Sequence, residues 1–272
     1  MSRPNATQPI SCILGAITLA VLGCSGNEGP EVHSTINRPD WPAISERRVL
    51  FAHQSVGANI LSGIRQLAAR DRVQLTVQEW DGGNLELGIS HFKVGKNGDP
   101  QSKLAAFRSA LASTDGTPPD VAMLKLCYVD FNENTNAKQL ALDYVATLDD
   151  MAARYPHTVF VAVTAPLASL QSGPKAWLKK VLGIPPGQYV ENTKRSEFNA
   201  ILRNKFGSTN RLFDLAAIES GGQTLSPTDN SDNVVVQSLD PSLTYDGGHL
   251  NERGEQLAAI ALLGLLSNTP AN

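Results

Sequence analysis

The chain has 272 residues, of which 42% are hydrophobic, enough for one globular domain with a substantial core. Its 23 basic and 26 acidic residues give a formal net charge of −3. This balance provides no basic surface of the kind that nucleic-acid-binding proteins use, so nucleic acid is not an expected partner.

The first 23 residues are expected to be a targeting segment that takes no part in the fold. Arg3 precedes an apolar stretch over residues 10–23, which is short for a bilayer span. The stretch ends in Leu-Gly-Cys-Ser, a pattern that resembles a bacterial lipoprotein signal with Cys24 as the lipidated residue. We therefore expect an exported, membrane-anchored lipoprotein. Ser25 is not the Asp that marks inner-membrane retention, which favours the outer membrane, and an ordinary signal peptide is the alternative.

Residues 24–47 are rich in Gly, Pro, Asn and Glu, which is typical of a flexible tether. Beyond this tether only Cys127 remains, so an intramolecular disulfide is excluded. Cys127 lies in an apolar run and is expected to be a small buried hydrophobe. The five histidines show no close clustering with other ligand types, so neither a metal nor a cofactor is expected.

From residue 48 the hydrophobic pattern alternates between strand and helix. Strands are predicted at residues 49–53, 73–79, 121–128, 158–164 and 211–215, and helices at 58–69, 101–111, 137–154, 193–206 and 251–266. Residues 80–100 are predicted to form a loop, residues 170–192 an inserted segment, and residues 216–244 a long polar loop. Five strands with intervening helices indicate one α/β domain over residues 48–268, with a parallel sheet covered on both faces.

Two short segments carry the candidate chemistry. Asp246 and His249 stand three positions apart just before the last helix, and Ser55 follows the first strand. A carboxylate beside an imidazole, combined with a serine hydroxyl, is the arrangement of a catalytic triad. Each residue alone is also common as a helix cap or turn residue, so a purely structural role is the alternative. Their joint placement favours a site, because open α/β sheets bind ligands at the carboxyl ends of their strands.

These segments resemble the SGNH hydrolases, also called the GDSL esterase/lipase superfamily. The Ser of that family's Gly-Asp-Ser block matches Ser55 in His53-Gln54-Ser55, and its Asp-x-x-His block matches Asp246 and His249 in full. The resemblance implies a flavodoxin-like three-layer α/β/α fold and a Ser-His-Asp triad.

The same resemblance implies an oxyanion hole formed by the backbone N–H groups of Ser55 and Gly98. The family's oxyanion-binding Asn is replaced by Val129, which marks the chain as a divergent member. Asn97, Asn132 and Lys125 are candidate substitutes.

The predicted residues that line the site or contact substrate are His53, Lys125, Asp130 and Asn132. Four residues near the site also have alternative roles. Asn97 and Asn132 could serve only to form turns. Lys125 could be a buried cation paired with Asp130. His53 is expected to position the serine turn through a local hydrogen bond.

The sequence thus predicts an exported serine esterase without metal or cofactor. Its favoured substrate class is a small-molecule or glycan ester, above all an O-acetyl group on a carbohydrate. The alternative is a non-catalytic glycan-binding or envelope protein that keeps the fold with a degenerate site.

Overall fold

The structure is a computed structural model that describes residues 39–114, 116–221, 224–225 and 236–269. The predicted signal, Cys24 and most of the predicted tether lie outside these residues. Within the described part, none of the helices combines the length and the apolar character that crossing a bilayer requires.

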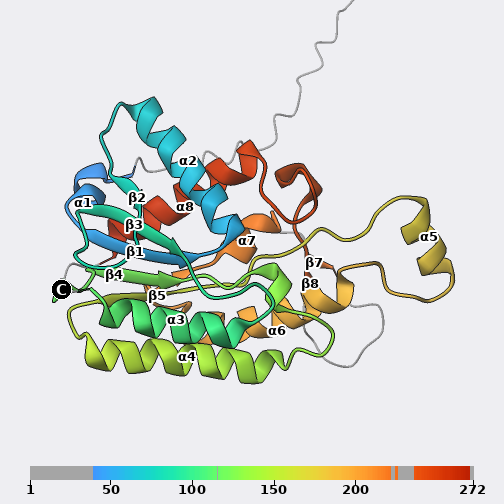
Figure 1. Cartoon of the computed structure of the whole chain (residues 1–272). Helices are drawn as coiled ribbons and strands as arrows, with labels where there is room; N and C mark the ends of the chain where they lie inside the picture. Colours follow the sequence, from blue (N-terminus) through green and yellow to red (C-terminus); the bar gives the residue numbers. More distant parts are fainter. Residues whose placement is uncertain (1–38, 115, 222–223, 226–235, 270–272) are drawn as a thin grey trace, which may run out of the picture. The chain divides into compact units, whose positions relative to one another are not determined.

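The elements follow one another in strand and helix alternation for most of the chain (Figure 1). The strands are β1 (Arg48–His53), β2 (Val77–Glu79), β3 (Gly88–Lys93), β4 (Val121–Leu124), β5 (Val159–Val163), β6 (Leu212–Phe213), β7 (Thr224–Leu225) and β8 (Val236–Gln237). The helices are α1 (Trp41–Ser45), α2 (Ser55–Asp71), α3 (Pro100–Ala112), α4 (Ala137–Arg154), α5 (Pro174–Val181), α6 (Tyr189–Phe206), α7 (Leu215–Glu219) and α8 (Glu252–Asn268).

The central sheet has six parallel strands in the order β2-β3-β1-β4-β5-β6. Without the edge strand β2, this is the 2-1-3-4-5 order of flavodoxin-like folds. The predicted fold class is therefore confirmed. After β1 the chain forms β2 and β3 on one side of that strand and then crosses to β4 on the other side. The switch in strand order therefore falls between β1 and β4.

Alternate side chains of each central strand enter two separate cores, as the pleat of a β-strand requires. In β1, Val49 and Phe51 face one cluster while Leu50 and Ala52 face the other. The first cluster is covered by α1, α2 and α8, and the second by α3, α4 and α6. Figure 1 shows these helices on opposite faces of the sheet. The result is a three-layer α/β/α arrangement.

The domain begins earlier than the sequence indicates. Residues 41–45, assigned to the tether, form α1, and Ile44 is fully buried in the first core cluster. The Trp41 indole N–H donates to Asp71 at 3.1 Å. Among the residues that the structure describes, the members of both clusters run from Trp41 onward, and residues 37–272 form one compact unit. This unit therefore contains both core clusters of the described part of the chain.

The sheet has one more strand than predicted, because β3 lies inside the segment expected to be a loop. The predicted strand at 73–79 shortens to β2, and the one at 121–128 ends at Leu124. The inserted segment contains the short helix α5, and the loop over 216–244 contains α7 and the antiparallel pair β7–β8. These differences matter for the site, because β3 lies beside β1.

Helices α2 and α8 pack closely against each other through Gly63. A Cβ atom added at Gly63 would lie 2.3 Å from the backbone oxygen of Glu255. One turn earlier in α2, the Asn59 amide donates to the Glu255 carboxylate at 2.8 Å. The absence of a side chain at Gly63 thus sets how near the middle of α2 approaches the first turn of α8.

Replacing Gly63 with alanine is expected to destabilise the domain by about 1–3 kcal/mol, because the added methyl group forces α8 away. The matched control is Gly264→Ala in α8, where an added Cβ meets no atom within 4 Å. That change should stabilise the helix by up to about 1 kcal/mol through propensity alone. Urea unfolding of the two variants measures both effects, and equal effects would contradict the role assigned to Gly63.

Candidate active site

The candidate site lies at the carboxyl edge of the sheet, where three segments meet. Ser55 follows β1, Tyr128 follows β4, and His249 precedes α8. The β1 and β4 strands are paired in parallel, with Ala52 opposite Leu124, so the segments that leave them begin side by side. The ring of His249 lies 5.8 Å from that of Tyr128, centroid to centroid.

Asp246 and His249 form the acid–base half of a triad. The Asp246 Oδ2 and His249 Nδ1 atoms are 2.6 Å apart. The other oxygen, Oδ1, accepts the backbone N–H groups of Gly248 and His249 at 2.9 and 2.7 Å. Because a carboxylate holds the Nδ1 proton, the Nε2 atom of His249 is left as the proton acceptor.

Partial burial acts to raise the pKa of Asp246, but hydrogen bonds from His249 and Gly248 outweigh it and lower that pKa from 3.8 to about 2. The carboxylate is therefore ionised across the neutral pH range. An ionised carboxylate at this distance favours the imidazolium that forms when His249 takes a proton.

Tyr128 and Tyr245 fix the His249 ring from two sides. Tyr128 meets it edge to face, and Tyr245 stacks on it with an interplanar angle of 13°. Tyr128 reaches this position because Gly248 has no side chain; a Cβ there would lie 2.7 Å from the Tyr128 ring. The Tyr128 carbonyl accepts two hydrogen bonds from the buried Arg195 guanidinium, at 3.1 and 2.8 Å.

Ser55 is the exposed first residue of α2, a helix whose amino terminus carries no side-chain cap and no acidic residue in its first turn. The Gln54 side chain in the capping position instead donates to the carbonyls of Val94 and Gly95. First-turn N–H groups have no acceptor within a helix, and the helix dipole makes this end positive. The Ser55 N–H is thus a donor suited to an oxyanion.

Among the residues that the structure describes, no hydrogen bond joins Ser55 to His249. Such a bond is often long in unliganded sites and tightens when substrate binds. The structure thus brings Ser55 and His249 to one edge of the sheet, with the acid–base pair already formed.

His53 is buried beneath the serine turn and belongs to a hydrogen-bonded chain that reaches α2. Its Nδ1 atom lies 2.9 Å from the Gln54 carbonyl oxygen, and its Nε2 atom lies 3.2 Å from Nδ1 of His91. The Nε2 atom of His91 lies 3.4 Å from the Arg65 guanidinium. A carbonyl only accepts and a guanidinium only donates, so the direction is fixed: Arg65 donates to His91, His91 to His53, and His53 to the carbonyl.

Burial lowers the pKa of His53 from 6.5 to about 3, and burial also lowers the pKa of His91. Both rings are thus neutral near pH 7, as the direction of these hydrogen bonds requires. The expected positioning role of His53 agrees with its bond to Gln54, whereas direct substrate contact is wrong because His53 is 2% exposed.

Asp130 is a structural anchor, and its predicted partner is wrong. Its carboxylate receives the ammonium of Lys103 at 2.6 Å, and both side chains are fully buried. Lys125 instead donates to the Leu126 carbonyl at 3.0 Å. Asp130 and Lys125 are 2% and 0% exposed, so neither lines the site for substrate.

The oxyanion role predicted for Gly98 does not fit this structure. The Gly98 N–H donates to Asp130 Oδ1 at 2.9 Å, so the donor is already used. The amide oxygen of Asn97 accepts from Lys103 at 3.1 Å, which ties that side chain to the same ion pair. Val129, at the position of the family's Asn, has an exposed apolar side chain that cannot donate.

Asn132 has the turn-forming role considered as its alternative. Its Oδ1 atom accepts the Asn134 N–H at 2.9 Å, and its own N–H donates to Thr135 at 2.8 Å. It also lines a cavity of about 370 Å³ together with Gly98 and the first residues of α3 and α4.

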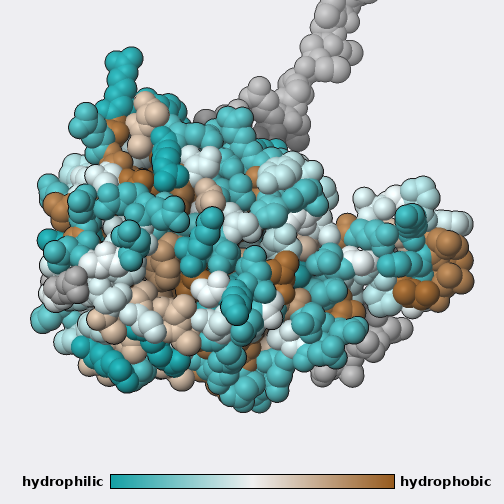
Figure 2. All heavy atoms as spheres, in the orientation of Figure 1, coloured by the Kyte–Doolittle hydropathy of each residue, from teal (hydrophilic) through white to brown (hydrophobic). Residues whose placement is uncertain are grey.

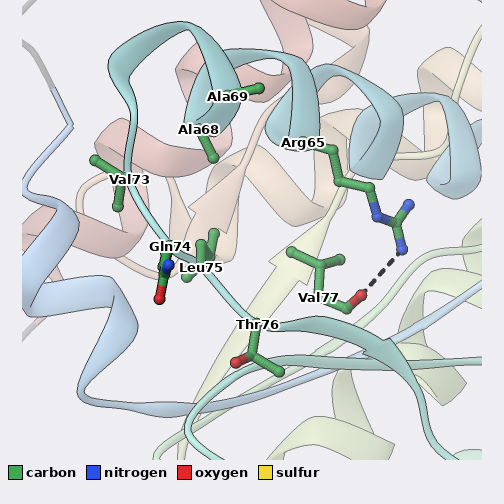
Figure 3. Close-up of a pocket in the computed structure, with 8 residues that line it drawn as sticks. All are labelled: Arg65, Ala68, Ala69, Val73, Gln74, Leu75, Thr76 and Val77. Atoms are coloured by element: carbon green, nitrogen blue, oxygen red, sulfur yellow. Dashed lines mark hydrogen bonds between the residues drawn. The ribbon is translucent and has the colours of Figure 1, made fainter.

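A larger cavity, of about 490 Å³, lies away from the candidate triad (Figure 3). It is bounded by Arg65, Ala68 and Ala69 of α2 and by residues 73–77 leading into β2. Ser55 is thirteen residues from Ala68 along the helix, or about 20 Å. In Figure 3 the Arg65 guanidinium is bonded to the Val77 carbonyl.

Several residues that shape the site carried no sequence signal of their own. Arg195 lies in the middle of α6, Tyr128 follows a strand that is too short to show its end, and His91 belongs to the unpredicted β3. The regular spacing of buried positions in α6 could have identified Arg195, because a charged residue on a helix's buried face needs a specific partner.

No protein-family model matches the chain. No curated protein matches it. Solved structures with a similar fold include a protein provisionally described as a platelet activating factor from Streptococcus pneumonia, with 16% identity, a TM-score of 0.48, and coverage of 81% of this chain and 84% of that one.

Two further solved structures also have a similar fold. A provisionally described lipolytic protein of the G-D-S-L family from Desulfitobacterium hafniense has 10% identity, a TM-score of 0.44, and coverage of 80% and 98%. A variant of an acetyl-xylooligosaccharide esterase from Geobacillus Stearmophilus has 11% identity, a TM-score of 0.39, and coverage of 82% and 94%. At these identities and TM-scores the likeness concerns the fold alone.

Glu219 is a buried carboxylic acid that binds the backbone of the segment after β5. Glu219 Oε2 accepts the Leu167 N–H at 2.6 Å, while Oε1 has no hydrogen-bond partner in the described part of the chain. Burial raises the pKa of Glu219 from 4.5 to about 8 and lowers the pKa of the buried Lys125. The folded protein therefore holds a proton on Glu219 at neutral pH.

This proton makes stability depend on pH. Between pH 4.5 and 8 the folded state binds more protons at Glu219 than the unfolded state, so the free energy of unfolding falls as the pH rises. From pH 7 to pH 9, across the pKa of Glu219 in the folded protein, the loss is about 1 kcal/mol. Glu219→Gln, an analogue of the protonated acid, should remove this loss. Urea unfolding of wild type and the variant at pH 7 and 9 measures this loss of stability. Both proteins keep Lys125, so the comparison isolates the change at Glu219. Parallel pH profiles would contradict the assignment.

Proposed function

We propose that this protein is a serine hydrolase that cleaves a carboxylic ester. The observation that carries the proposal is the 2.6 Å contact between Asp246 and His249 at the sheet edge where Ser55 begins α2. A nucleophile, a base and an orienting acid are the groups that acyl transfer needs.

In this mechanism Ser55 Oγ attacks the ester carbonyl while His249 Nε2 takes the hydroxyl proton. His249 then gives the proton to the leaving alcohol, and an acyl group remains on Ser55. Water, activated by the same imidazole, releases the acid and restores the serine. Asp246 stays ionised and stabilises the imidazolium in both steps.

The developing oxyanion would be bound at the amino terminus of α2. The Ser55 N–H points from the positive end of a seventeen-residue helix, and neither a cap nor a carboxylate competes for it. Among the predicted side-chain donors the Asn97 amide nitrogen is the remaining candidate, because Lys125 is buried and Asn132 forms a turn.

A short acyl group on a bulky alcohol is the favoured substrate, with O-acetylated carbohydrate as the first choice. Ser55 is exposed, the His249 side chain is 27% exposed, and Tyr245 is 68% exposed. A site this open accommodates a large alcohol. We also propose that the protein is exported and anchored through Cys24, which places it among envelope glycans.

Ester hydrolysis by the triad is tested with p-nitrophenyl acetate and a panel of acetylated sugars. Ser55→Ala and His249→Ala should each lower kcat/KM by at least about 1000-fold, and Asp246→Asn by a similar order, because the imidazole loses its orienting charge. Ser109→Ala, an exposed serine of α3, is the matched control and should behave as wild type.

Equal rates for wild type and Ser55→Ala would refute nucleophilic catalysis at this position. In that case a non-catalytic glycan-binding or envelope protein, the alternative from the sequence, would account for the retained fold.

A further inference from the structure

A short arm with an unusual apolar surface extends from the domain. The arm comprises residues 171–187 and contains α5; it is closed at its base by the Gln171 N–H, which donates to the Gly187 carbonyl at 3.1 Å. Its large apolar side chains are exposed to solvent: Trp177 66%, Leu178 53%, Val181 61%, Leu182 62% and Ile184 49%. Figure 1 shows α5 standing away from the sheet, and Figure 2 shows apolar atoms gathered at its end.

The spacing of these residues makes α5 amphipathic. Trp177 and Val181 are four positions apart, as are Leu178 and Leu182, so the four side chains share one face of the helix. Soluble proteins rarely expose contiguous apolar residues unless the surface binds something.

The charge of the arm is opposite to that of the whole protein. The chain carries a net charge of −3, yet no acidic residue occurs between Asp150 and Glu191, while the arm has three lysines at positions 175, 179 and 180. By helical spacing, Lys175 and Lys179 lie along one edge of the apolar face. An apolar face with a tryptophan, bordered by basic residues, is the pattern of helices that lie in the interface of an anionic bilayer.

The arm is joined to the candidate site at both of its ends. Just before the arm, the Ser169 N–H donates to the Gly247 carbonyl at 2.8 Å, within the loop that carries His249. Just after it, Gln188 accepts from Arg195 at 3.2 Å, and Arg195 holds the Tyr128 carbonyl. A surface bound by the arm would therefore lie near the site.

We propose that the α5 arm is a docking element for the surface of an anionic phospholipid bilayer. The apolar face would enter the boundary between headgroups and acyl chains, and the lysines would contact lipid phosphates. The proposal does not depend on the triad, and it goes beyond the proposed function by giving the enzyme a working surface.

Trp177 provides a built-in probe for this docking. Trp41 and Trp80 are 8% and 7% exposed, so a change in tryptophan emission on adding vesicles reports the one exposed indole. Residues 37–272, the compact unit that contains both core clusters, are mixed with vesicles of phosphatidylglycerol and phosphatidylcholine or of phosphatidylcholine alone. We expect a blue shift and flotation with the anionic vesicles, and weak binding to the neutral ones.

Matched variants separate the two parts of the surface. Lys175→Glu with Lys179→Glu should lower partitioning into anionic vesicles at least tenfold, since each basic charge contributes about fivefold. Val181→Ser with Leu182→Ser should abolish flotation. Leu142→Ser, which removes a similarly exposed leucine from α4, should bind as wild type does.

Three results would overturn the proposal. The first is wild-type protein that shows neither a shift in tryptophan emission nor flotation, and the second is equal binding by the Val181/Leu182 variant. The third is an emission shift that grows with protein concentration without vesicles, which would indicate pairing of two copies. Hydrolysis of p-nitrophenyl acetate should stay unchanged in every arm variant. A failure of the docking surface is thus distinguishable from a failure of the triad.

An independent observation, the directed chain Arg65–His91–His53, supports a second inference. The chain ends on the Gln54 carbonyl, which also accepts the Gly57 N–H at 2.7 Å. That carbonyl and the Ser55 N–H belong to the same peptide group. Hydrogen bonds accepted by one end of a peptide strengthen donation from the other.

We infer that His53 and His91 are positioning residues that orient and polarise the Gln54–Ser55 peptide for the oxyanion. This inference rests on the proposed function. His53 is 2% exposed, so it acts through the peptide, and it is held at its place because Gly57 has no Cβ, which would lie 2.4 Å from the His53 side chain.

The test is rescue by an analogue of the imidazole donor. His91→Leu removes the donor and should lower kcat three- to tenfold with KM unchanged. His91→Asn keeps a nitrogen donor at the position of Nδ1 and should restore most of the rate. Equal rates for the two variants, whether slow or fast, would overturn the inference, while the Ser55→Ala result judges the triad separately.

Discussion

The parallel pairing of β1 with β4 is the constraint on which the site depends. Because the two strands are adjacent and in register, the chain leaves both at one edge, and Ser55 and Tyr128 emerge beside each other. A shift of register by one residue would turn Phe51 toward the wrong core and carry the serine with it. His249 arrives from the far end of the chain, on the segment before α8, and α8 packs against α2 at Gly63.

The buried carboxylate of Asp130 ties the loops after β3 and β4 into one rigid unit. It accepts the Lys103 ammonium and the N–H groups of Cys127 and Gly98, so the pair leaves no charge unsatisfied. Removing one partner from such a pair costs about 3–5 kcal/mol, since the other charge stays buried alone. The same bonds explain why Gly98 does not serve the oxyanion: its N–H is part of the framework.

Much of the fold could be predicted from the sequence, because the central strands are buried on both faces and appear as continuous apolar runs. The spacing of Asp246 and His249 also determines their contact, since three residues bring both side chains to one turn. The strand β3 was missed because Gly88-Ile-Ser-His-Phe-Lys mixes polar and apolar residues and follows a glycine-rich loop.

The partner of Asp130 and the contact between His53 and His91 could not be predicted, because both depend on which strands are adjacent. Lys103 lies 27 positions before Asp130, on helix α3, whereas Asp130 follows β4. His91 reaches His53 only once β3 is placed beside β1 with Phe51 opposite His91. Sequence spacing carries no information on such pairs, so Lys125 was the plausible but incorrect partner.

In the proposed hydrolase, Val129 at the position of the oxyanion Asn of SGNH hydrolases would move the electrostatic work of the site from a side chain to the main chain. Losing a side-chain donor typically costs two to three orders of magnitude in turnover, so the remaining donor must be strong. The structure supplies the conditions for that at Ser55: a helix amino terminus with no acid in its first turn.

The residue before the nucleophile explains how this terminus stays open. The family's Gly-Asp-Ser block has a carboxylate at the position of Gln54, and a negative charge there would oppose an oxyanion. Gln54 is neutral, and its amide is drawn to the carbonyls of Val94 and Gly95. In the proposed hydrolase, the departures at Gln54 and Val129 would therefore be linked, because the backbone donor at Ser55 is not capped by a side chain.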